Sequence, residues 1–186
     1  FILAFAVAVL GAEYSTGTIR NSLSYFVDRR KVFFAKCITG FLCCLAYTCL
    51  CLIVSFIVGT LLFGFGGFSL TLFIRVLLQI LLSIPLYLGM VAIGNVLLVF
   101  TKRTSITIAT YLIGLIVFPS FTNQLLQLFP KAEWLQLCDP LSAFSVLSRF
   151  WEFPFGVVGM ILLFWFLLDA LLLFAGSRLY TNADIA

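Results

Sequence analysis

Histidine is absent from this chain of 186 residues. Its absence excludes Ser-His-Asp triads, Cys-His nucleophiles and every His-ligated metal site. Charged side chains are also scarce, at 10% of the residues. A typical soluble domain carries about 25%. So few charges argue against a soluble enzyme and a disordered tail.

Apolar residues take the place of the missing charges. Of all residues 63% are hydrophobic and 17% aromatic, and the mean hydropathy is +1.22. A globule of this size has too high a surface-to-volume ratio to bury so many apolar side chains. A soluble enzyme, a disordered tail and a secreted disulfide scaffold are therefore excluded. The predicted fold class is all-α, a polytopic bundle of transmembrane helices, with room for about five spans of 20 residues.

Five apolar segments are separated by short polar or glycine-containing breaks. The predicted spans are residues 1–12, 37–63, 76–100, 105–121 and 155–176. The first segment is too short to cross a bilayer, and it lacks the basic start and the cleavage site of a signal peptide. We therefore expect residues 1–186 to form a single transmembrane domain that is incomplete at its N-terminus.

Basic residues predict the orientation, because cytoplasmic loops carry an excess of Lys and Arg. One set of connections holds Arg20, Arg29, Arg30, Lys31, Lys36, Lys102, Arg103 and Arg178, and the other holds Arg75, Lys131 and Arg149. The larger set is expected in the cytoplasm, together with the C-terminus. The net charge of +4 fits this bias, so we expect the lipid bilayer and no nucleic acid as a partner.

The connection at residues 13–36 has the most unusual sequence. Ile19, Leu23 and Phe26 stand at the spacing of one helix face. This spacing predicts a short amphipathic helix on the cytoplasmic side. Such a helix either lies on the bilayer surface or docks into a groove of a soluble partner.

The run from Glu13 to Asn21, EYSTGTIRN, resembles the E-x-x-x-G-T-I-R-N motif of ABC-2 type transporter permeases. These permeases are the membrane subunits of ATP-binding cassette exporters, and the motif follows their second transmembrane helix. Residues 28–31 and Lys36 resemble the S-R-…-K continuation of the family, with Asp28 where a small polar residue is usual. The resemblance implies a domain of six spans, of which this chain holds the last five.

The resemblance also implies a partner. The loop at residues 13–36 would hold a coupling helix seated in a separate ABC ATPase subunit, and a second permease copy or a sister permease would complete the path. The implied ATPase-coupling residues are Glu13, Gly17, Thr18, Ile19, Arg20, Leu23, Arg29 and Arg30. For Glu13 and Arg20 the alternative is a solvated position at the end of a membrane helix.

ATP is expected to bind elsewhere, because the chain has no G-x-x-x-x-G-K-[ST] motif. We expect no catalytic residue and no cofactor on this chain, which is then not an enzyme by itself. ATP and Mg would be used by the partner ATPase.

Asp169 is the one acid deep inside a predicted span. An acid in hydrocarbon costs about 2.5–3.5 kcal/mol on insertion scales. It is either a substrate-path or proton-linked residue, or a partner in a structural hydrogen bond. Asn95 and Gln79 are weaker candidates for the substrate path, since amides inside spans often form hydrogen bonds between helices.

Five of the six cysteines lie between Cys37 and Cys51 on one predicted span. They lack the C-x-x-C spacing of metal sites, so we expect no metal and interpret them as small apolar residues at helix contacts.

The predicted extracellular connection at residues 123–154 is rich in aromatic residues. Helical spacing predicts two short interfacial helices in it, broken by Pro130 and Pro140. The first would contain Leu125, Leu128 and Phe129, and the second Trp134 and Leu137. By the resemblance these helices would form an extracellular lid, and the alternative is a simple anchor at the interface.

Together with these observations, the resemblance to ABC-2 type permeases implies the permease subunit of an ATP-driven exporter in a bacterial plasma membrane. The expected substrate is an antimicrobial peptide or a hydrophobic drug, which would connect the chain with antibiotic resistance. The alternative is an ion-coupled secondary carrier or a channel subunit. Such proteins usually show more intramembrane charge or repeated halves than this chain does.

Overall fold

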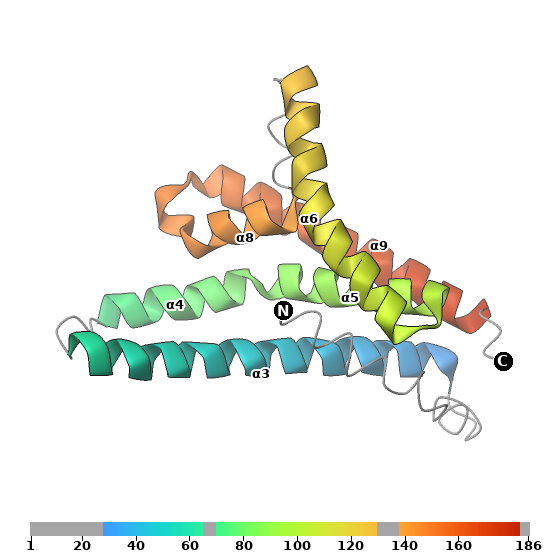
Figure 1. The fold of residues 1–186 in the computed structure, drawn as a ribbon, viewed down its shortest axis with the longest axis horizontal. Coiled ribbons are helices and arrows are strands. Elements are labelled where there is room, and N and C mark those ends of the chain that lie inside the picture. The colour runs from blue at the N-terminus through green and yellow to red at the C-terminus, as the bar shows by residue number, and fades with distance from the viewer. Residues whose placement is uncertain (1–27, 65–69, 130–137, 183–186) are drawn as a thin grey trace.

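The computed structural model describes residues 28–64, 70–129 and 138–182 (Figure 1). In these ranges the regular secondary structure is entirely helical. The elements are α3 (Arg29–Phe63), α4 (Leu70–Leu82), α5 (Ile84–Thr101), α6 (Thr104–Leu128), α8 (Pro140–Ser148), the 3-10 helix η1 (Phe150–Glu152) and α9 (Phe155–Asn182). The all-α prediction is therefore confirmed for the described part of the chain.

Four helical segments are long and apolar enough to cross a membrane. They are Arg29–Leu62, Leu70–Thr101, Thr104–Leu128 and Phe155–Thr181. Their length and composition are those of a membrane protein, as the composition predicts. The predicted span at residues 1–12 lies outside the described residues.

Local sequence explains where these helices begin and end. The Asp28 side chain accepts a hydrogen bond from the backbone N–H of Arg30 and caps the start of α3. Gly64 follows α3 with φ of 74°, a conformation that glycine adopts without strain. The second segment breaks at Ser83 into α4 and α5, because Pro85 lacks the N–H that a continuous helix needs.

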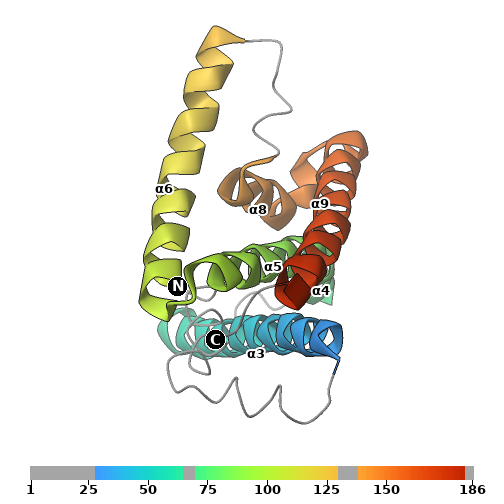
Figure 2. The same cartoon turned by 90° about the vertical axis from the view of Figure 1, so that its right-hand side faces the viewer.

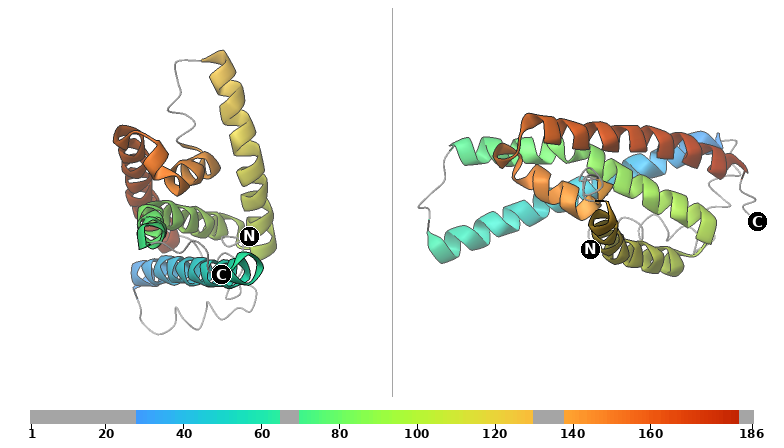
Figure 3. Two further views of the ribbon diagram at one scale, coloured as in Figure 1. Left: turned by 90° about the vertical axis from the view of Figure 1, so that its left-hand side faces the viewer. Right: turned by 90° about the horizontal axis from the view of Figure 1, so that it is seen from above.

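Helix α5 lies in the middle of the molecule, between α3 on one side and α8 and α9 on the other (Figures 2 and 3). It contacts α3, α6 and α9, and half of its 18 residues are buried. The main core cluster collects side chains from α5, α6, α8 and α9: Leu86, Met90, Tyr111, Ala143, Leu147, Val158, Ile161 and Trp165. In contrast, α3 and α6 leave most of their apolar residues exposed, as expected for helices that face lipid.

The segment after α6 differs from the sequence prediction. The prediction of a separate short helix at Leu125 and Leu128 is wrong. Both residues belong to the last turns of α6, which continues beyond residue 121. Pro140 does not break a helix but begins α8, where its missing N–H is not needed. The second predicted helix, with Trp134 and Leu137, lies outside the described residues.

Basic side chains gather at one end of the helical bundle. The start of α3, the end of α5, the start of α6 and the end of α9 lie at the same end of the molecule, at the right of Figure 1. The described basic residues of the larger set lie in or next to these ends: Arg29, Arg30, Lys31, Lys36, Lys102, Arg103 and Arg178. At the opposite end the Arg75 guanidinium stacks over the Trp151 ring, 5.0 Å from its centroid. We call the end at the right of Figure 1 the basic end of the bundle.

Candidate functional site

At the basic end, the first turns of α3 are joined to the last turns of α9. The Arg29 Nη1 donates a hydrogen bond to the Thr181 carbonyl oxygen over 3.2 Å. The rings of Phe33 and Tyr180 pack with their centroids 5.9 Å apart, and both side chains are buried with Cys37. We call these five residues the α3–α9 junction. Side chains far apart in the sequence thus fix the two helices to each other.

Of the predicted ATPase-coupling residues, only Arg29 and Arg30 lie in the described part of the chain. Both are exposed in the first turn of α3. The other six lie outside the described residues: Glu13, Gly17, Thr18, Ile19, Arg20 and Leu23. Their predicted role stays a prediction.

Asn95 is buried between α5 and α3, where its Nδ2 donates a hydrogen bond to the Cys37 Sγ over 3.3 Å. Asn95 therefore forms a hydrogen bond between helices, which the sequence analysis gave as the alternative to a role in the substrate path. Gln79 lines a small cavity of about 180 Å³ between α3 and α4, with Thr48, Ser55 and Ser83 among its neighbours. The two amides therefore lie in different places.

Asp169 is buried in the contact between α9 and α5, with 6% of its surface exposed. Its Oδ1 has no hydrogen-bond partner in the described part of the protein. Gly89 of α5 lies directly opposite: a Cβ built on this glycine would stand 2.6 Å from that oxygen and 2.9 Å from Cε3 of Trp165. The absence of a side chain at Gly89 is what lets the acid and the indole pack against α5.

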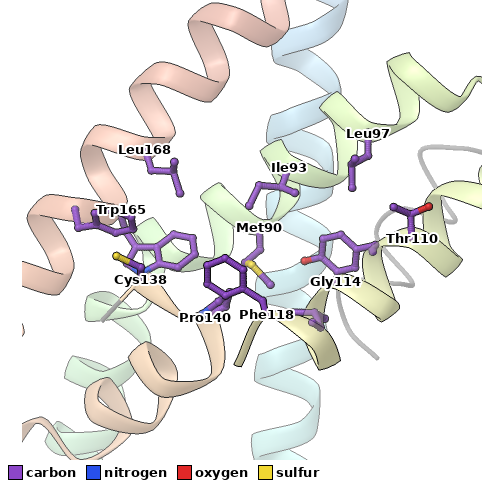
Figure 4. Close-up of a pocket in the computed structure, with 13 residues that line it drawn as sticks. Met90, Ile93, Leu97, Thr110, Gly114, Phe118, Cys138, Pro140, Trp165 and Leu168 are labelled. Atoms are coloured by element: carbon purple, nitrogen blue, oxygen red, sulfur yellow. The ribbon is translucent and has the colours of Figure 1, made fainter. Parts of the chain in front are cut away.

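Trp165 also forms one side of a larger cavity of about 440 Å³ (Figure 4). Its size is in the range of sites that bind small molecules. In Figure 4 Trp165 and Leu168 lie on one side of the cavity, and Thr110 and Gly114 lie on the other. The described lining residues are Met90, Ile93, Leu97, Thr110, Tyr111, Gly114, Leu115, Phe118, Cys138, Pro140, Phe164, Trp165 and Leu168.

Two aromatic residues of this cavity carry polar atoms that are not satisfied. The Tyr111 hydroxyl and the Trp165 Nε1 are both buried without a hydrogen-bond partner among the residues that the structure describes. Sequence analysis missed both residues. A signal was present, because Tyr and Trp normally stand at membrane interfaces, whereas these two stand inside predicted spans.

The structure thus brings only one of the three predicted substrate-path residues near this cavity. Asp169 is four residues after Trp165 on α9, so the two lie on the same helix face. Asn95 and Gln79 are not among the described residues that line the cavity. The candidate site is therefore the cavity between α5, α6 and α9. Asp169 lies next to Trp165, which lines this cavity.

No group of three or more His, Cys, Asp or Glu side chains that could hold a metal ion occurs within residues 28–64, 70–129 and 138–182. Cys37 and Cys44 are buried in helix contacts of α3. Cys138 lies in the connection before α8, and burial raises the pKa of its thiol. A raised pKa makes a thiol less reactive. Cys138 is one of the described residues that line the cavity.

Neither protein-family models nor curated protein sequences give a match to this chain.

Proposed function

We propose that the chain is the permease subunit of an ATP-driven exporter of the ABC-2 type. It would work with a separate ABC ATPase subunit and with a second permease, either another copy or a sister protein. The proposed location is a bacterial plasma membrane with the C-terminus in the cytoplasm. Four helical segments long and apolar enough to cross a membrane support this proposal, and so does the motif from Glu13 to Asn21.

The α3–α9 junction is the observation that carries the proposal. The first turn of α3 belongs to the segment that resembles the coupling loop, and Arg29, Phe33 and Tyr180 hold it against the last turns of α9. Helix α9 also forms a wall of the large cavity. A displacement of the loop by an ATPase would then move α3 and α9 together, as a coupled rigid-body motion requires.

The cavity supports the proposed substrate class. Its described lining residues include no charged side chain, so an antimicrobial peptide would enter with an apolar part and a hydrophobic drug could enter whole. Export of such molecules would protect the cell from them, which is the proposed link to antibiotic resistance.

The test co-expresses the chain with a candidate ABC ATPase subunit. Arg20→Glu should abolish co-purification of the ATPase and ATP-dependent export, because the substitution reverses the charge in the proposed coupling helix. Arg103→Glu makes the same charge change at the basic end but outside the loop, and it should leave both unchanged. If Arg20→Glu retains both the ATPase and export, the coupling proposal is refuted.

One observation favours the alternative, an ion-coupled carrier or channel subunit. Asp169 is a buried acid inside a helix long enough to span a membrane, and such acids are common in proton relays. Transport in proteoliposomes separates the two functions. Dependence on ATP and the partner ATPase supports the exporter, whereas transport driven by a proton gradient alone, and lost in Asp169→Asn, supports the carrier.

A further inference from the structure

A smaller cavity lies where α3 crosses the segment formed by α4 and α5 (Figure 3). Its volume is about 180 Å³, and we call it the polar cavity. Polar atoms form a clear part of its wall, whereas the wall of the cavity between α5, α6 and α9 is almost wholly apolar. Half of its described lining residues carry a hydroxyl or an amide: Thr48, Ser55, Gln79, Ser83 and Tyr87.

The polar cavity lies beside the break between α4 and α5. Ser83 stands at this break, lines the cavity and is only 1% exposed. Pro85 has no N–H, so the backbone carbonyl of Leu81, four residues earlier, loses its usual donor. In a membrane, groups freed in this way are satisfied by neighbouring helices, by Ser or Thr side chains, or by ordered water. The break therefore creates a demand for hydrogen bonds next to the cavity.

The side chains of the polar cavity both accept and donate hydrogen bonds. The Ser83 Oγ donates to the Gln79 carbonyl oxygen over 2.8 Å, and the Thr48 Oγ1 donates to the Cys44 carbonyl oxygen over 2.8 Å. Because a hydroxyl has one hydrogen, both oxygen atoms keep lone pairs that can only accept. The Gln79 amide adds an NH₂ donor and a carbonyl acceptor. A fitting ligand therefore donates as well as accepts.

Charge and size restrict the ligand further. The described lining residues include no acid, so a metal cation would lose its hydration there without gaining a counter-charge. An acyl chain would leave the hydroxyl and amide groups without partners, which is costly. Water is uncharged, donates and accepts, and takes about 30 Å³ per molecule in the liquid, so several molecules fit. Cavities that stay dry in proteins are apolar, and this one is not.

We propose that the polar cavity binds a cluster of ordered water molecules inside the apolar part of the bundle. The water forms hydrogen bonds with the Gln79 amide and with the hydroxyl groups of Thr48, Ser55 and Ser83. It compensates for the helical hydrogen bonds that are lost at the break between α4 and α5. In this assignment Gln79 holds water rather than a transported substrate. The site requires neither ATP nor a partner ATPase, so this proposal and the proposed transport function can fail separately.

The test is radiolytic footprinting of the full chain in lipid nanodiscs. X-rays generate hydroxyl radicals from bound as well as bulk water, and the radicals oxidise the nearest side chains. Cys51 lines the polar cavity, whereas Cys49, two residues earlier on α3, does not line it and is more exposed. We expect Cys51 to be oxidised several-fold faster than Cys49, as measured by mass spectrometry. Oxidation of Cys49 at an equal or higher rate overturns the proposal.

A pair of double variants tests whether the polar side chains hold the water. Gln79→Leu with Ser55→Ala removes an amide and a hydroxyl from the cavity. The matched control is Gln124→Leu with Ser120→Ala, which makes the same changes at exposed positions of α6 that do not line the cavity. Oxidation of Cys51 should fall several-fold in the first variant and stay unchanged in the control.

Two results of these experiments refute the water site. Equal oxidation of Cys51 in the unchanged chain and in both double variants shows that the polar side chains do not hold water. Protection of Cys51 by sodium chloride, but not by choline chloride, shows that the cavity binds a cation instead. The comparison of Cys51 with Cys49 uses the unchanged chain, so it does not depend on the folding of any variant.

Discussion

Replacing Gly89 by alanine tests the contact between α5 and α9 that places Asp169 and Trp165. The added Cβ would stand 2.6 Å from the Asp169 Oδ1, which is 0.8 Å closer than the 3.4 Å at which ordinary van der Waals contact begins. The Trp165 ring is also too close, because its Cε3 is at 2.9 Å. The Asp169 and Trp165 side chains must therefore shift together, or the two helices must move apart.

The cost of this movement can be compared with the gain in helix propensity. Overpacking a tight contact costs about 1–3 kcal/mol, whereas alanine in place of glycine inside a helix gains about 0.5–1 kcal/mol. We expect Gly89→Ala to lower the free energy of unfolding by about 1–2 kcal/mol. Gly114→Ala meets no atom within 4 Å, so it should receive the gain alone and be slightly stabilised.

The assay is reversible unfolding of the purified chain in mixed micelles with increasing SDS, followed by circular dichroism. The variant Asp169→Ala removes the nearest clashing atom. Gly89→Ala should therefore lower the free energy of unfolding less in the Asp169→Ala variant than in the unchanged chain. The packing argument is refuted if Gly89→Ala is as stable as Gly114→Ala, or if the double variant shows no coupling between the two positions.

Two further contacts can be tested with the same unfolding assay. Asp139 accepts hydrogen bonds from the backbone N–H groups of Leu141 and Ser142 at the start of α8, so Asp139→Ala should cost about 0.5–2 kcal/mol, and Asp139→Asn should retain most of that stability; equal losses in the two variants would contradict the capping role. Asn95 and Cys37 should show a coupling energy of about 0.6 kcal/mol in a double-mutant cycle with Asn95→Ala and Cys37→Ala, whereas additive effects would show that their hydrogen bond contributes nothing.

Hydropathy was sufficient to find the four long apolar helical segments, because a segment that can span a membrane is apolar along most of its length. It did not find α8. It was less informative about their ends. Helix α6 continues to Leu128 because the residues after 121 keep helical spacing, and the sequence pattern alone did not show that they extend the same helix. Pro140 is ambiguous in a similar way, since proline both interrupts a helix and begins one.

The candidate site could not be predicted from the sequence, for a different reason. The cavity combines residues from Met90 to Leu168, and their proximity depends on how α5, α6 and α9 pack. Asp169 could be singled out because an acid inside a span is rare. Tyr111 and Trp165 look like ordinary apolar residues until the structure shows that their polar atoms are buried without partners within the described ranges.

Helix α3 is longer than a bilayer is thick. Its 35 residues measure about 52 Å at 1.5 Å per residue, while a hydrocarbon core is about 30 Å. A helix longer than the hydrocarbon core tilts or extends into the headgroup region. The first turns of α3 carry Arg29, Arg30 and Lys31, so extension is favoured at that end. These turns are fixed to α9 through the α3–α9 junction. In a bilayer, a change in thickness that tilts α3 would therefore also tilt α9.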